Sequence, residues 1–121
     1  MRHESLYLTD ILEAADHIAE FIAETDFPAF QESELLRSAV VQKLAIIGEA
    51  AARVSEALKT RYPHVPWPQI IAFRNILVHA YFGIDWDVVW LAARNRCPIL
   101  RAQIAGILAA ESGGTRDEVG G

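Results

Sequence analysis

The stretch SELLRSAVVQKLAIIGEAAARVSEALKTR, residues 33–61, decides the fold. Apolar side chains recur along it at helical spacing and form one long stripe, made of Leu36, Val40, Leu44, Ile47, Ala51, Val54 and Leu58. A second, shorter stripe lies about one residue further around the helix and consists of Val41, Ala45, Gly48 and Ala52. So wide an apolar face predicts a central helix that contacts more than one neighbour. The small residues in it would let another helix come close.

Further helices are expected on both sides of this stretch. Apolar periodicity predicts them over about residues 5–25, 68–82 and 86–110. The segment Asp26–Phe30 should break the chain before Ser33 caps the long helix, and Gly83 should end the third. Asp85 can cap the last helix, which Pro98 should kink or split in two. No stretch demands a strand, so the sequence predicts an all-α fold, an antiparallel four- to five-helix bundle.

Length and composition limit what the chain can be. Its 121 residues suit one domain, predicted over residues 1–111, with a polar, Gly-rich and flexible tail over residues 112–121. The lone Cys97 cannot form an internal disulfide, and no metal-ligand framework or cofactor motif is visible. Neither a signal peptide nor a membrane span is apparent, so we expect a soluble, cytoplasmic protein. The net charge of −5 argues against a general nucleic-acid coat protein, but it allows a nuclease with a small basic cleft.

The stretch AFRNILVHAY, residues 72–81, is the part that could carry chemistry. On a continuous helix Arg74 and Tyr81 lie almost above one another, and Asn75 shares a face with His79. An arginine can hold two phosphate oxygens, and a histidine titrates near neutral pH and can move a proton. Such a patch can bind a phosphodiester and act on it. The same residues also fit a helix-end histidine, a tyrosine at the core edge and a paired surface arginine.

The pattern Arg74-x4-His79-x-Tyr81 resembles the motif of the HepT-like toxins, small helical ribonucleases of the HEPN superfamily. Other features of that family stand in the same order along about residues 5–108. They are Ile47-Gly48-Glu49-Ala50, Val65-Pro66-Trp67, the Asn75 that follows the arginine, and the Ile84-Asp85 step toward Val89-Trp90. This ordered set is more specific than the short motif alone.

The resemblance implies a HEPN-like homodimer that cleaves RNA without a metal in a cleft between its protomers. Arg74 would bind the scissile phosphate, His79 would be the acid–base group, and Asn75 would orient the phosphate or the histidine. It also implies a type II toxin–antitoxin pair, in which a minimal nucleotidyltransferase antitoxin adds AMP to Tyr81. No cofactor is expected. The RNA target and the dimer geometry lie beyond what the sequence predicts.

Several alternatives stay open at this point. Glu49 could contact the cleft or be a plain solvated acid, and Arg94, Arg96 and Arg101 fit solvated charges better than phosphate contacts. The chain could be a non-catalytic HEPN module that binds nucleotides or proteins, although the intact Arg, His and Tyr argue against it. It could also be a structural bundle, which would give His79 no special environment.

Overall fold

The structure, a computed structural model, describes the backbone of residues 3–120 and the side chains of residues 3–112. Its elements in chain order are α1 (Glu4–Ile22), α2 (Phe27–Glu32), α3 (Glu34–Arg53), α4 (Glu56–Arg61), α5 (Trp67–His79), a 3-10 turn (Tyr81–Gly83), α6 (Trp86–Leu91), a π-helical segment (Ala92–Arg96) and α7 (Cys97–Gly120). No strand forms within the described residues, so the predicted all-α, HEPN-like class is confirmed.

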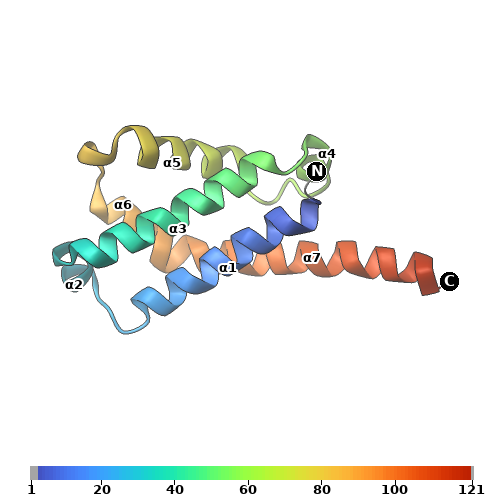
Figure 1. Cartoon of the computed structure of the whole chain (residues 1–121), viewed down its shortest axis with the longest axis horizontal. Coiled ribbons are helices and arrows are strands. Elements are labelled where there is room, and N and C mark those ends of the chain that lie inside the picture. The colour runs from blue at the N-terminus through green and yellow to red at the C-terminus, as the bar shows by residue number, and fades with distance from the viewer. Residues whose placement is uncertain (1–2, 121) are drawn as a thin grey trace.

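The four long helices form an antiparallel bundle. Helix α3 lies between α1 and α5, and α7 packs along α1 on another side (Figure 1). The core between them consists mainly of aliphatic side chains, among which Ile11, Ile18, Val40 and Ile104 are completely buried. Each such side chain contributes about 1.5–3 kcal/mol through burial, so the bundle is held mainly by apolar packing.

Most of the wide apolar face of α3 is used within the chain, although Ala52 near its end is exposed. Val40, Leu44 and Ile47 are buried, and α1 and α5 cover the two sides of the helix. The expected close approach occurs at Gly48, where an added Cβ would lie 2.1 Å from Cβ of Arg74 on α5. The prediction that small residues let a neighbouring helix come close is therefore confirmed. The residue of that helix in closest contact with Gly48 is Arg74.

The prediction of one helix over residues 33–61 is wrong at a single point. Ser33 caps α3 as expected, its hydroxyl accepting a hydrogen bond from the Leu36 amide at 3.1 Å. The helix ends at Arg53, and Ser55 then caps the separate helix α4 through the Leu58 amide at 3.2 Å. The Glu4 carboxylate at the start of α1 also accepts hydrogen bonds from the Ser55 amide and hydroxyl. These contacts hold the chain in an extended conformation where the apolar stripe alone predicted continuity.

The breaks on either side of the bundle are partly as predicted. The segment after Asp26 is not merely a break but forms the short helix α2, because Asp26 accepts a hydrogen bond from the Ala29 amide at 3.0 Å. Its Phe30 is buried against Trp90, the two ring centroids being 5.2 Å apart. Asp85 caps α6 as expected, accepting from the Asp87 amide at 3.0 Å.

The last predicted helix changes its geometry ahead of Pro98, where the sequence predicted a kink or a split, but its helical residues are not interrupted. Between α6 and α7 the backbone widens into the π-helical segment Ala92–Arg96, in which the Cys97 amide donates to the Ala92 carbonyl. A proline lacks an amide hydrogen and its ring presses on the carbonyl four residues earlier, so a wider turn relieves that contact. Helix α7 continues to Gly120, but the side chains of residues 113–120, and residue 121, lie outside the described part, so the flexible tail over residues 112–121 stays a prediction.

Candidate active site

Two buried residues fix the position of helix α5. Trp67, in its first turn, is 4% exposed, and its indole nitrogen donates a hydrogen bond to the Tyr62 carbonyl at 3.0 Å. Leu77, near the other end, is 2% exposed. Val65 in the preceding loop is also buried. With these anchors in the core, the polar residues of α5 face outward from a helix that cannot easily rotate.

Arg74 is the best-defined polar residue of this helix. Its Nη2 lies 2.7 Å from Oε2 of Glu49 on α3, and its Nη1 donates to Oδ1 of Asn75 at 3.1 Å. The side chain is only 31% exposed. Its backbone end presses against Gly48, which leaves it little freedom. The guanidinium is therefore held in one orientation before any ligand arrives.

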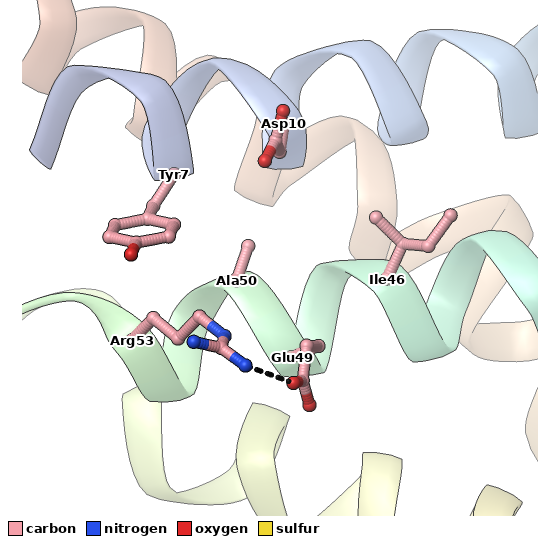
Figure 2. A pocket seen from close by; sticks show the side chains of 6 residues that line it. All are labelled: Tyr7, Asp10, Ile46, Glu49, Ala50 and Arg53. Carbon is pink, nitrogen blue, oxygen red and sulfur yellow. Dashed lines mark hydrogen bonds and ion pairs between the residues drawn. The ribbon is translucent and has the colours of Figure 1, made fainter. Parts of the chain in front are cut away.

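Glu49 is shared between two arginines. While Oε2 binds Arg74, Oε1 accepts from Arg53 at 3.1 Å, one turn further along α3 (Figure 2). The Glu49 carboxylate, with a smaller contribution from Tyr7, raises the pKa of Arg53 above its ordinary value. Of the two alternatives for Glu49, the plain solvated acid is thus wrong, because it contacts the predicted site residue directly. The trio Arg53, Glu49 and Arg74 carries two positive charges and one negative charge.

His79 is the last residue of α5 and is exposed. The helix is regular as far as this residue, so Asn75 and His79 share a face as predicted. Among the described residues no hydrogen bond or ion pair to the His79 side chain is found. A His79 without such contacts is also what a purely structural bundle predicts. The placement of Arg74, rather than that of His79, therefore distinguishes a ribonuclease from a structural bundle.

Tyr81 lies beyond the end of α5. The helix stops at His79, two residues before Tyr81, so the expected stacking of Tyr81 above Arg74 on a continuous helix is wrong. A 3-10 turn begins instead at Tyr81. The ring of Tyr81 packs edge-on against the ring of Trp86, and the two ring centroids are 6.0 Å apart. The side chain is 36% exposed, as expected of a tyrosine that another protein can reach.

Comparison with known proteins assigns the family. The model described as "Ribonuclease HepT-like" matches residues 11–107, which includes every part of the site. The chain belongs to the HepT-like ribonuclease family.

Several relatives support the HepT-like assignment. "Putative RNase MJ1380" of Methanocaldococcus jannaschii is 35% identical over 85% of this chain and 94% of that protein. "Probable ribonuclease HepT" of Thermococcus cleftensis is 37% identical over 80% of this chain and 88% of that protein. "Putative RNase TTE0752" of Caldanaerobacter subterraneus is 31% identical over 87% and 94%, respectively. No solved structure matches the chain.

The other candidate cationic residues of this HepT-like chain make none of the contacts described for Arg74 and Glu49. Arg94 and Arg96 are exposed in the π-helical segment, and Arg101 pairs with Asp16 of α1 at 2.7 Å. In the described residues no three His, Cys, Asp or Glu side chains are grouped so that they could hold a metal ion. Within the same described residues, no helix has both the length and the apolar character needed to cross a membrane.

Three residues near the site were not predicted from the sequence. Arg53 stands four positions after Glu49, a spacing that places the two on one helix face and that could have been recognised. Tyr7 and Asp10 come from α1 and border the same hollow as Glu49 and Arg53 (Figure 2). Nothing in the local sequence links them to α3, because their approach depends on how the two helices pack.

Proposed function

We propose that this HepT-like protein is a metal-independent endoribonuclease, the toxin of a type II pair whose antitoxin is a minimal nucleotidyltransferase. The observation that carries the proposal is the placement of Arg74, whose Cβ and Cγ pack on Gly48 and whose guanidinium lies 2.7 Å from Glu49. A surface arginine without a task needs neither contact. The family membership supplies the substrate class, since its described activity is that of a ribonuclease.

The chemistry requires only proton transfer and charge stabilisation. The ribose 2′-oxygen attacks the adjacent phosphorus, the bond from phosphorus to the 5′-oxygen breaks, and a 2′,3′-cyclic phosphate forms. The proton of the 2′-hydroxyl passes to a base, and an acid supplies a proton to the departing 5′-oxygen. His79 is the group that moves protons, and a histidine from each protomer of a homodimer divides the two roles.

Arg74 stabilises the negative charge that develops on the phosphate in this step. The neighbouring trio retains a net charge of +1, because one carboxylate lies between two guanidiniums. The site can therefore attract a phosphate even though the chain as a whole carries −5. Asn75, whose side-chain oxygen accepts from Arg74, orients the guanidinium rather than the histidine.

The homodimer is proposed to form around α5. Most of the broad apolar face of α3 is covered by α1 and α5, so it does not supply the interface. Three apolar side chains near the motif are instead open to solvent, since Ile76 is 54%, Val78 48% and Phe82 102% exposed. Contact through them would bring Arg74 and His79 of two copies to a shared cleft. A stable interface should bury more than about 1,000 Å².

The decisive experiment compares RNA cleavage by the wild type, Arg74→Ala and His79→Ala, each with and without chelator. Both variants should lose activity by about 10²–10⁴-fold and keep their fold, because exposed ion pairs contribute only about 0–1 kcal/mol. Arg101→Ala and His17→Ala serve as matched controls, since one residue is an exposed paired arginine and the other an exposed histidine. Persistent cleavage in both site variants, or loss on adding chelator, would refute the assigned roles.

Tyr81 is proposed as the residue that the antitoxin modifies with AMP. Its hydroxyl-bearing ring is partly exposed two residues after His79 and rests on Trp86. A phosphodiester and an adenosine attached there would stand beside the end of α5 and obstruct the approach of RNA to His79. Such inhibition needs no change of fold.

A further inference from the structure

A pocket bordered by Glu49, the ion-pair partner of Arg74, has no role in the mechanism proposed above. It lies between α1 and α3, measures about 380 Å³, and is lined by Tyr7, Asp10, Ile46, Glu49, Ala50 and Arg53 (Figure 2). This size falls in the range of about 300–1,000 Å³ that small-molecule sites occupy. Its lining combines an aromatic ring, apolar carbons, two carboxylates and one guanidinium.

The lining favours a nucleoside over a bare phosphate. Two carboxylates, Asp10 and Glu49, line the pocket beside the single guanidinium of Arg53, and carboxylate oxygens can accept hydrogen bonds from the amino groups of a base. Tyr7 and the carbons of Ile46 and Ala50 offer surfaces on which a base can pack. The guanidinium of Arg53, which is 59% exposed, is available to bind a phosphate at the rim.

The pocket is joined to the proposed catalytic site through one side chain. Glu49 borders the pocket and holds Arg53 with one oxygen while it holds Arg74 with the other. The two guanidiniums therefore lie within the reach of a single carboxylate. Successive phosphates of one RNA strand can contact the two guanidiniums in turn. A nucleoside between or beside these phosphates can then turn into the pocket.

We propose that this pocket is a nucleoside subsite of the RNA-binding site, taking the nucleoside next to the scissile phosphate, with Arg53 binding the phosphate attached to it. The proposal rests on the proposed ribonuclease function and extends it to a second nucleotide. Arg53 acts in substrate binding, and Glu49 positions both arginines. The subsite also explains how an acidic protein can hold single-stranded RNA with few basic residues.

The test compares a dinucleotide, which has only the scissile phosphate, with a trinucleotide that has a second. In Arg53→Ala the KM for the trinucleotide should rise about tenfold, and kcat should change little, because one charge-assisted contact is lost. Cleavage of the dinucleotide should be affected much less, because the dinucleotide lacks the phosphate that Arg53 is proposed to bind. The salt dependence of trinucleotide binding should weaken by about 0.7 in log–log slope, and Arg53→Lys should restore it.

Arg101→Ala is the matched control, because Arg101 is also an exposed arginine paired with a single carboxylate. An equal effect of Arg53→Ala on both substrates, or the same effect from Arg101→Ala, would overturn the subsite. Binding of a labelled trinucleotide to the His79→Ala protein, followed by fluorescence anisotropy, separates the two proposals. If that binding depends on Arg53 while the wild type cleaves no RNA, the nuclease mechanism is refuted and the subsite is supported. If the wild type cleaves RNA but trinucleotide binding does not depend on Arg53, the subsite is refuted and the nuclease mechanism is supported.

Discussion

Replacing Gly48 by alanine tests whether the close approach of α3 and α5 places the candidate site. The new Cβ would lie 2.1 Å from Cβ and 2.6 Å from Cγ of Arg74. Carbon atoms in contact prefer about 3.5–4.0 Å, so the two helices would have to separate by roughly 1.5 Å. Because the atoms affected lie next to the Arg74 backbone, a change of rotamer cannot relieve the contact.

Two effects of opposite sign decide the result. Alanine improves the helix propensity of an interior position by about 1 kcal/mol relative to glycine. Overpacking of a tight helix contact costs about 1–3 kcal/mol, and the severity of this contact places it in the upper part of that range. We therefore expect Gly48→Ala to lower the free energy of unfolding by about 1–2 kcal/mol and Tm by about 4–8 °C.

Gly106→Ala provides the matched control. Gly106 also lies inside a helix, α7, but an added Cβ there meets nothing within 4 Å. Only the propensity effect remains, so this variant should be about 0.5–1 kcal/mol more stable than the wild type. Thermal and urea unfolding followed by circular dichroism measure both variants. A Gly48→Ala protein as stable as Gly106→Ala would refute the packing argument, and unchanged RNA cleavage would separate the contact from the site.

Two further predictions concern single side chains. Tyr81→Phe should fold normally, keep most RNA cleavage and escape modification by a partner nucleotidyltransferase with ATP; intact mass spectrometry showing AMP on the variant would contradict the assignment. Cys97 is 5% exposed, and burial raises the pKa of its thiol to about 12. At pH 8.5 the thiolate fraction is on the order of a thousandth or less, so a thiol reagent should modify the native protein far more slowly than the urea-unfolded one. Equal rates would mean that the core of the bundle does not shield the thiol.

The bundle was predictable because local sequence patterns indicate most of its helices. Apolar spacing located α1, α3 and α5, and Ser33 and Asp85 were recognised as caps because a short polar side chain precedes each helix. Helix α2 was missed although Asp26 followed by Pro28 is itself a helix-start signal. The break at Ser55 depends in part on Glu4, which is far away in the sequence, and local spacing cannot reveal such a contact.

The candidate site was predictable only in part for the same reason. Gly48 indicated a close approach on α3, but which residue of α5 meets it depends on how the two helices are aligned. The pairing of Arg74 with Glu49, 25 positions earlier, follows from that alignment. Tyr81 was misplaced because the spacing argument assumed that α5 continues past His79.

The π-helical segment before α7 has a consequence for changes in chain length. A π turn accommodates one residue more than an α turn while the helix continues on both sides. Because a proline ring clashes with the carbonyl four residues earlier in a regular α-helix, we expect the wider turn at Ala92–Arg96 to relieve that clash for Pro98. The extra residue and the proline therefore compensate for each other. Deleting one residue from Ala92–Arg96 would leave the proline pressing on a regular helix, whereas a deletion combined with replacement of Pro98 would give an uninterrupted helix whose buried faces stay where they are.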